Sequence, residues 1–209
     1  ISRHDRIILR DLAKTVAEHA ADPIMDERRE LWYRHNSLDR PRPMILVFPE
    51  GSWRELVPAE TLQCETDEAR GMERKLRMRA YYRDHLLDDT VIEREWVVPM
   101  AVSSSGWGLQ PRFTDSPEAH GAWGFDPVIK EPQDLDKLEL PRITHDEEET
   151  GRRLAVAADL LGDILDVRLK GVDRIHVGLY SIYAKLRGLN QVMMDMYDYP
   201  DMLHRAMEI

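Results

Sequence analysis

The sequence has little cysteine and no long hydrophobic run. Its single cysteine, Cys64, excludes an internal disulfide. Because no secretion signal is visible either, we expect a reducing, cytoplasmic location. A membrane-spanning helix needs about 18 consecutive apolar residues, and the most apolar run, Met44 to Pro49, is cut by Glu50. The sequence therefore predicts a chain that does not enter a membrane.

Basic residues are also scarce relative to acidic ones. The chain has 29 Lys and Arg against 39 Asp and Glu, which gives a formal net charge of −10. Such a charge repels phosphate backbones, and no Lys/Arg-rich arm offsets it, so nucleic acid is excluded as an expected partner. With 209 residues, of which 43% are hydrophobic, the chain is long enough to bury about 70% of its extended surface in a core.

Hydrophobic residues recur at helical spacing in several segments. Ile8, Leu12 and Val16 are spaced four apart and mark one face of an opening helix. Thr144 and Glu147 have the spacing of a capping box, which predicts that a helix begins there. Pro200 is suited to the first turn of a last helix. The predicted helices are 6–20, 26–35, 66–85, 144–161, 189–197 and a final one from residue 200.

Three segments have the composition of strands. Residues 43–49 form a continuous apolar run between prolines, which is typical of a strand covered on both faces. Residues 91–102 are rich in β-branched and aromatic side chains, and residues 166–178 alternate between apolar and polar positions. Between them, residues 110–142 are rich in proline and aromatic residues, which predicts a hairpin or an ordered excursion.

The alternation of helices and apolar strands predicts an α/β fold with parallel strands. Two architectures fit: the first part of a TIM (β/α)8 barrel, which takes about 250 residues, or a small open parallel sheet. No glycine-rich phosphate loop follows the first strand. The sequence begins at Ile1 and its last helix lacks a cap, so we expect a fragment of a longer chain. Open strand edges predict self-association or a completing chain segment.

The loop after the first predicted strand contains Glu50, Trp53 and Arg54. In a barrel these side chains would lie at the carboxyl end of the strands, where active sites form. An aromatic wall beside an arginine suits a flat, anionic ligand, which makes the three residues candidates for substrate binding. The alternative is structural: Trp53 closes the end of the core, and Arg54 pairs with a nearby glutamate.

The second predicted strand contains Glu93 and Glu95, which share one face because neighbouring strand residues point in opposite directions. Two carboxylates inside a barrel would raise each other's proton affinity, as general acid or base catalysis requires. A solvated edge of the sheet is the alternative. Trp107, in the turn that ends this strand, is a further candidate for substrate binding.

His176 lies in an apolar stretch shortly before Tyr180 and Tyr183. It is either a buried core histidine or a catalytic one. None of the eight histidines has the spacing of a zinc motif, so the sequence itself predicts no metal site. Cys64 has no neighbouring histidine and is a weak candidate for a nucleophile.

Two longer segments resemble the uroporphyrinogen decarboxylase superfamily. Within residues 124–141, the run from Pro132 to Pro141 matches the family pattern P-x-D-L-x-K-L-x-x-P. Within residues 178–204, Leu186-Arg187-Gly188 leads to Asp198-Tyr199-Pro200-Asp201, followed by His204, which resembles the family pattern D-x-P-E-x-x-H. The resemblance extends from about Met44 to the end of the chain.

This resemblance implies a TIM barrel of the uroporphyrinogen decarboxylase type with extra N-terminal helices. Residues 1–42 would then form the helical extension, and residues 43–209 the first, incomplete part of the barrel. The superfamily contains porphyrinogen decarboxylases and corrinoid-dependent methyltransferases. Of the arginine-rich loop that holds acetate groups in the decarboxylases, only Arg54 is retained. Glu93 or Glu95 stands where the decarboxylases have an aspartate, and Tyr180 or Tyr183 corresponds to a family tyrosine.

These departures favour methyl transfer over decarboxylation. The resemblance implies a tetrapyrrole-linked substrate, with Glu93, Glu95, His176 and Tyr180 as catalytic residues. Glu50, Trp53, Arg54, Trp107 and Tyr183 would bind substrate. A small molecule or a corrinoid protein is the expected partner, and methylcobalamin is the expected co-substrate. Zinc, where the family uses it, would be bound by the later half of the barrel. A porphyrinogen decarboxylase and a non-catalytic corrinoid-binding subunit are the alternatives.

Overall fold

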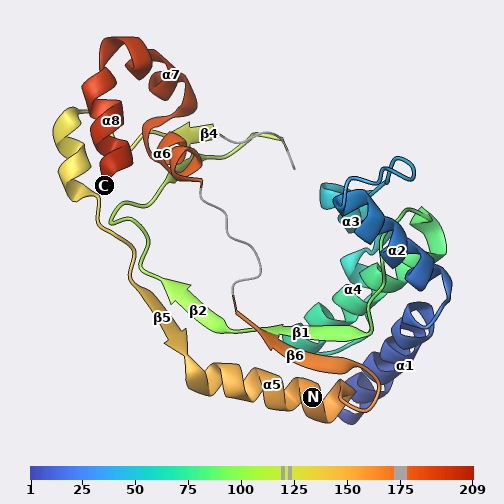
Figure 1. Ribbon diagram of the computed structural model, residues 1–209. Coiled ribbons are helices and arrows are strands. Elements are labelled where there is room, and N and C mark those ends of the chain that lie inside the picture. Colours follow the sequence, from blue (N-terminus) through green and yellow to red (C-terminus); the bar gives the residue numbers. More distant parts are fainter. Residues whose placement is uncertain (119–120, 122–123, 172–177) are drawn as a thin grey trace. The chain divides into compact units, whose positions relative to one another are not determined.

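The computed structural model describes residues 1–118, 121, 124–171 and 178–209. Within the chain, two compact units are distinguished by their internal contacts (Figure 1). The first unit consists of Ile1–Pro99 and Glu148–Lys170, and the second of Met100–Glu147 and Gly171–Ile209.

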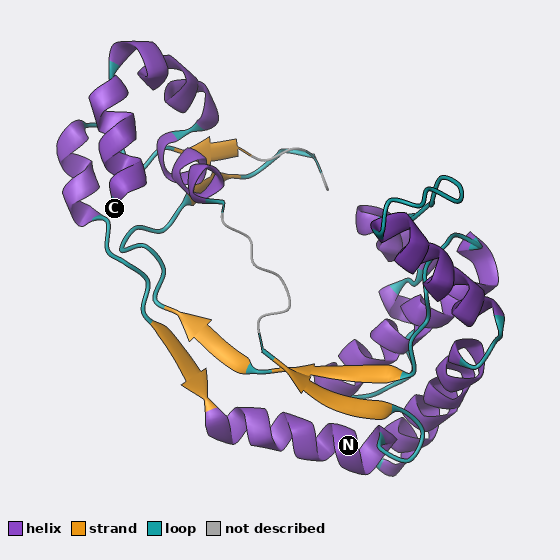
Figure 2. Ribbon diagram, viewed as in Figure 1, coloured by secondary structure: helices purple, strands orange, loops and turns teal. Residues whose placement is uncertain are grey.

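The first unit is mainly helical (Figure 2). Its elements are α1 (Arg3–Ala20), α2 (Ile24–Asn36), η1 (Glu50–Ser52), α3 (Trp53–Leu56), η2 (Ala59–Thr61), α4 (Asp67–Tyr81), the π-helical turn η3 (Tyr82–Leu86), β1 (Glu95–Pro99), α5 (Glu147–Leu161) and β6 (Asp166–Lys170). The strands β1 and β6 form a parallel pair in which Glu95 lies opposite Asp166 and Pro99 opposite Lys170.

The core of this unit forms where α1, α4, β1 and α5 turn their apolar faces inward. On α1, Leu9, Ala13 and Val16 are fully buried, one helical turn apart. On β1, Trp96 and Val98 are buried, whereas Glu95 and Val97 on the other face are half-buried, as the two-residue period of a strand requires. These residues pack with others of the same cluster, including Leu76, Leu160 and Leu165.

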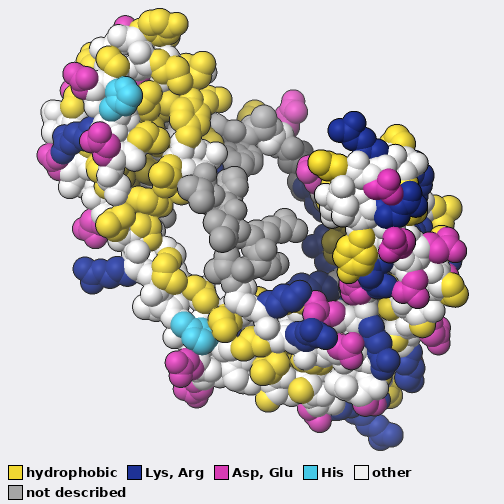
Figure 3. All heavy atoms as spheres, viewed as in Figure 1, with side chains coloured by type: hydrophobic (Ala, Val, Ile, Leu, Met, Phe, Trp, Pro, Cys, Tyr) yellow, Lys and Arg dark blue, Asp and Glu magenta, His cyan; other side chains and the backbone are white. Residues whose placement is uncertain are grey.

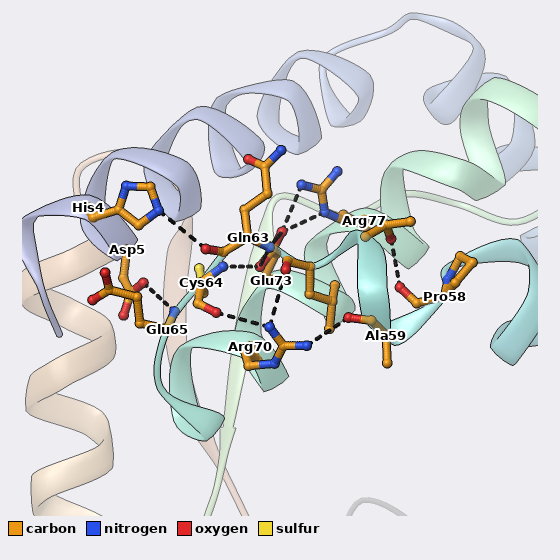
Figure 4. A network of polar contacts seen from close by, with 12 residues as sticks. His4, Asp5, Pro58, Ala59, Gln63, Cys64, Glu65, Arg70, Glu73 and Arg77 are labelled. Atoms are coloured by element: carbon orange, nitrogen blue, oxygen red, sulfur yellow. Dashed lines mark hydrogen bonds and ion pairs between the residues drawn. The ribbon is translucent and has the colours of Figure 1, made fainter.

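A buried carboxylate fixes the segment that leads into α4 (Figure 4). Glu73 is fully buried and accepts hydrogen bonds from the main-chain N–H groups of Gln63 (2.9 Å) and Cys64 (2.8 Å) and from Nε of Arg77 (2.8 Å). Asp5 of α1 accepts a third main-chain bond, from Glu65 (2.8 Å). Two carboxylates therefore accept the main-chain N–H groups of residues 63–65, as the carbonyls of a neighbouring strand would in a sheet.

The second unit contains short strands and three helices. Its elements are β2 (Ala101–Ser104), β3 (Arg112–Thr114), β4 (Gly124–Asp126), η4 (Pro132–Lys137), β5 (Ile143–Asp146), α6 (Leu179–Arg187), α7 (Leu189–Asp198) and α8 (Pro200–Glu208). The pairs β2–β5 and β3–β4 are both antiparallel. The core is a separate apolar cluster of Ile129, Leu135, Tyr183, Leu186, Val192 and Met202.

The predicted TIM barrel is wrong for this structure. The described residues form three sheets of two strands each, and only the β1–β6 pair is parallel. Six predicted helices are present as α1, α2, α4, α5, α7 and α8, and the predicted hairpin is present as β3 and β4. The boundary at residue 42 stays a prediction.

The barrel prediction depended mainly on the segment 43–49, which was expected to be a buried strand. It pairs with no strand among the described residues, and Ile45 and Phe48 are 60% and 70% exposed. The N–H groups of Ile45 and Val47 donate instead to the side chains of Asp89 (2.8 Å) and Asp88 (2.8 Å). Arg42 pairs with Asp89 and, as the main cause, lowers the pKa of that carboxyl to about 2.

Three local predictions also need correction. The predicted strand 91–102 is divided into β1 and β2, which belong to different sheets. Thr144 lies in β5, and its hydroxyl is 2.7 Å from that of Ser103, so it does not cap the helix, which begins at Glu147. Helix α6 occupies Leu179–Arg187, where no helix was predicted.

Among the helices that the structure describes, none is both long enough and apolar enough to cross a lipid bilayer. The cytoplasmic location stays a prediction.

We predict that Glu73→Gln lowers the free energy of unfolding by about 3 kcal/mol, because it leaves Arg77 and two main-chain donors poorly paired. Burial opposes the ionisation of Glu73, but its hydrogen bonds outweigh burial and lower its folded pKa below the ordinary 4.5. The stabilisation is thus complete above pH 4.5 and is lost as the pH falls through the folded pKa.

Urea unfolding between pH 3 and pH 7 measures this effect. Glu68→Gln is the matched control, because Glu68 forms an exposed ion pair with Arg152 whose loss costs less than about 1 kcal/mol. Equal losses in the two variants would contradict the prediction.

Candidate functional site

A small apolar recess in the second unit brings together two of the predicted substrate-binding residues, Trp107 and Tyr183. It has a volume of about 20 Å³, which is room for a water molecule or a methyl group. Its lining residues are Trp107, Leu138, Leu179, Ile182, Tyr183, Leu186, Ala206 and Met207.

Helix α6 forms the largest part of the wall. Leu179, Ile182, Tyr183 and Leu186 are spaced three, four and seven residues from the first, so they share one helical face. This face has the amphipathic spacing that identifies a helix in a sequence. The signal for α6 was therefore present, but the residues after the predicted strand 166–178 were interpreted as a loop.

Tyr183, which lines the recess, has a buried polar group. The residue is 3% exposed, and its buried hydroxyl has no hydrogen-bond partner among the described residues. Burial raises the pKa of Tyr183 above its ordinary value, so the phenol is neutral at physiological pH and can both donate and accept a hydrogen bond. A buried hydroxyl without a partner is costly in free energy, which marks it as a group that a ligand or a water molecule could satisfy.

Trp107 is positioned by the turn that contains it. Its carbonyl accepts a hydrogen bond from the N–H of Glu139 (3.1 Å). Gly108 adopts a left-handed backbone (φ 79°), and a Cβ atom there would lie 2.4 Å from the carbonyl oxygen of Lys137. Only glycine therefore fits at this point of the turn.

A buried ion pair, Arg187 with Asp195, lies at the end of the helix that lines the recess. Arg187 and Asp195 form two hydrogen bonds, of 2.7 and 2.9 Å, and their side chains are 6% and 0% exposed. Arg187 also donates to the carbonyls of Ile129 (3.2 Å) and Lys130 (2.6 Å). The hydrogen bonds between the two side chains raise the pKa of Arg187 and lower that of Asp195.

These bonds tie α6 to α7 and to residues 129–130. Gly188 ends α6 and immediately precedes α7, with a left-handed φ of 86°. Sequence reasoning noted Arg187 only as part of a family motif and did not predict its partner. Two charged residues eight positions apart gave no signal that they would be buried together.

Tyr180 lies on the same helix but outside the recess. It is partly exposed, and its hydroxyl is 3.5 Å from the sulfur of Met193 on α7. His176, the remaining predicted catalytic residue of this region, lies outside the described residues.

The five other predicted residues belong to the first unit. Trp53 is buried against the rings of Tyr81 and Tyr82, with centroids 5.7 and 5.4 Å away. Its role in substrate binding stays a prediction. Glu50 and Arg54 are exposed, and Nε of Arg54 donates to the carbonyl of Gly51 (3.2 Å).

Glu93 and Glu95 are both engaged by cations. Glu93 pairs with Arg29 (3.1 Å), and Glu95 pairs with Lys170 (2.7 Å) and Arg168 (3.3 Å). Lys170 is the main cause that lowers the pKa of Glu95. The expected rise in proton affinity is therefore wrong for Glu95, while the catalytic roles of both residues stay predictions.

Cys64 is buried between the carboxylates of Asp5 and Glu73, and its burial is the main cause that raises its pKa to about 12. A thiol with this pKa is not a nucleophile at neutral pH. Among the described residues, no cluster of three or more His, Cys, Asp or Glu side chains could hold a metal ion.

Comparison with protein-family models, curated proteins and solved structures gives no match. The resemblance to the uroporphyrinogen decarboxylase superfamily therefore stays a prediction from the motifs.

We predict that Tyr183→Phe raises the free energy of unfolding by about 1 kcal/mol, because it removes a buried hydroxyl that has no partner. Urea unfolding of the ligand-free chain measures the change. Tyr197→Phe serves as a control, because Tyr197 is 87% exposed and should not change stability. A loss of stability in Tyr183→Phe would show that the hydroxyl already has a partner.

We predict that Asp195→Leu lowers the free energy of unfolding by about 3–5 kcal/mol, because it leaves the Arg187 guanidinium buried without its counterion. The double variant Arg187→Met/Asp195→Leu should recover most of this loss. The coupling energy from a double-mutant cycle tests the pair directly. Additive effects of the two substitutions would contradict the prediction.

Proposed function

We propose that this chain is an enzyme of corrinoid-dependent methyl transfer that acts on a tetrapyrrole-linked substrate. The thiol or hydroxyl group that accepts the methyl group would bind in the recess of the second unit. The observation that carries this proposal is a small apolar recess lined by Tyr183, a residue whose buried hydroxyl has no partner among the described residues.

The two segments with family-like motifs meet at this recess. Leu138 comes from the first segment, and Leu179 and Leu186 come from the second. Residues that resemble the superfamily are thus neighbours in space as well as matches in order. Their meeting supports a functional interpretation of the motifs.

The lining suits a methyl group attached to sulfur or oxygen. Trp107 and the aliphatic side chains would surround the transferred methyl group, and the Tyr183 hydroxyl would hydrogen-bond to the acceptor atom. The oxygen of the neutral phenol can accept a hydrogen bond from the S–H or O–H group of the acceptor. Tyr183 would thus orient the acceptor for attack on the methyl group.

The expected methyl donor is methylcobalamin. Its cobalt–carbon bond would break as the bond to the acceptor forms, the electron pair would stay on cobalt as cob(I)alamin, and the proton of the acceptor would pass to solvent. Large apolar side chains are exposed on α6 and α7, and Figure 3 shows hydrophobic side chains gathered over this end of the chain. They include Leu179, Tyr180, Met193 and Met194. Flexible methionine side chains adapt to a large apolar ligand surface, which suits a corrinoid. The described residues do not offer a zinc site, so no step is assigned to zinc.

Porphyrinogen decarboxylation is less favoured by this site. A porphyrinogen carries several carboxylates, which need arginine or lysine partners. None of the eight residues that line the recess is charged. A non-catalytic corrinoid-binding role is separated from methyl transfer by measuring binding and turnover together.

We predict that the full chain, mixed with methylcobalamin and mercaptoethanol, forms the methyl thioether. The reaction is followed by mass spectrometry and by the visible spectrum of the corrinoid. Tyr183→Phe should lower kcat/KM about tenfold, the effect of one hydrogen bond, without changing the affinity for methylcobalamin. Tyr197→Phe should retain full activity.

Binding of methylcobalamin without turnover would show that the chain is a corrinoid-binding subunit and not an enzyme. Absence of both binding and turnover would contradict the proposal. Equal activity of the wild type and Tyr183→Phe would show that the Tyr183 hydroxyl takes no part in the reaction.

A further inference from the structure

A groove in the first unit is lined by β1 and by the helices α4 and α5. Its volume is about 260 Å³, whereas an apolar cavity of about 150 Å³ is enough to hold a benzene ring. Its apolar lining residues are Met72, Trp96, Val98, Val156 and Ala157. The groove therefore has room for a large apolar side chain.

The edge of β1 that faces away from β6 is open where the groove begins. The N–H of Asp166 donates to the carbonyl of Arg94 (3.0 Å). Because alternate residues of a strand bond to the same neighbour, Glu95 and Val97 direct their main-chain groups to the opposite edge. The carbonyl of Glu95 accepts from Arg79 of α4 (2.9 Å). The N–H and carbonyl of Val97, which lines the groove, bond to no described residue.

Four charged side chains line the groove. Glu68 and Arg153 already form ion pairs with other residues of α5. The side chains of Asp67 and Lys75 have no ion pair or hydrogen bond within the described part of the chain. These two residues lie on one face of α4, about 12 Å apart along the helix axis. The groove thus offers one negative and one positive charge to a ligand.

Gly71 lies between these two charges on the same helical face and also lines the groove. Glycine inside a helix is unfavourable relative to other residues. Its φ is not positive, and a Cβ atom at this position would meet no atom within 4 Å. The fold therefore does not require glycine here, and the missing side chain widens the groove.

We propose that the groove binds an extended peptide segment of another protein, which adds to the open edge of β1. The peptide carries an acidic and a basic residue four positions apart, with an apolar residue midway between them. In an extended chain these three side chains point to one side, and the outer two lie about 13 Å apart. The charges then pair with Lys75 and Asp67, and the apolar side chain lies beside Gly71.

The main chain of Val97 favours a peptide over a small molecule. Its N–H and carbonyl are a donor and an acceptor on one edge, which a single residue of an added strand can satisfy together. Peptides bind to strand edges in this way, while their alternate side chains enter pockets. This site is independent of the recess and of the proposed methyl transfer.

Two synthetic peptides with blocked ends test the proposal, Glu-Thr-Leu-Thr-Lys and its reverse, Lys-Thr-Leu-Thr-Glu. At least one should bind the full chain, and at ten times its Kd it should slow hydrogen exchange of the Val97 amide about tenfold, as measured by NMR. The order that binds more tightly gives the direction of the peptide along β1. Glu-Thr-Leu-Thr-Glu and Lys-Thr-Leu-Thr-Lys should bind more weakly, because one charge of each is repelled.

Three variants test the position of the peptide. Gly71→Leu should weaken binding about tenfold or more, because its side chain fills the groove, without loss of stability, since leucine is the better helix former. Gly151→Leu is the matched control: Gly151 lies in α5, its Cβ position is equally open, and it does not line the groove. Lys75→Glu should make Lys-Thr-Leu-Thr-Lys the preferred peptide.

The proposal is overturned if neither mixed peptide protects the Val97 amide, or if Gly71→Leu and Gly151→Leu affect binding equally. An unchanged order of peptide affinities in Lys75→Glu would also contradict it. A wild type that is dimeric by light scattering, with the Val97 amide protected before peptide is added, would assign the groove to a second copy of the chain instead.

Discussion

Bonds from buried or partly buried charged side chains to main-chain groups hold this structure together. In the first unit, Glu73 binds the amides of residues 63 and 64, and Asp89 binds the amide of Ile45. In the second unit, Arg187 binds the carbonyls of residues 129 and 130. The segments bound in this way lie outside the regular helices and strands, and their polar groups would otherwise lack partners. The ion pairs compensate the cost of burying these charges.

The recess depends on the same principle. Arg187 is the last residue of α6, and its bonds to Asp195 and to residues 129–130 fix the orientation of the helix face that carries Tyr183. The tyrosine hydroxyl has no partner among the described residues, whereas Arg187 and Asp195 are paired with each other. A site of this kind combines a rigid support with one unsatisfied polar group, an arrangement suited to binding a small ligand in one orientation.

Local periodicity was enough to predict most helices, because residues such as Leu12 and Val16 report a buried face directly. Pro200 likewise marks the start of α8. The sheet could not be predicted in this way. An apolar run such as 43–49 shows a preference for burial, but its hydrogen-bond partners, Asp88 and Asp89, are distant in the sequence and ordinary in type. Trp107 and Tyr183 were both candidates for substrate binding. That they line the same recess depends on tertiary packing, which the sequence pattern does not report.

The corner between α6 and α7 has a consequence for how this chain can change in evolution. Gly188 is the only residue between the two helices. One residue added or removed there would rotate α7 by about 100° about its axis, and Asp195 would turn away from Arg187. Changes of chain length are therefore expected to be excluded at this corner.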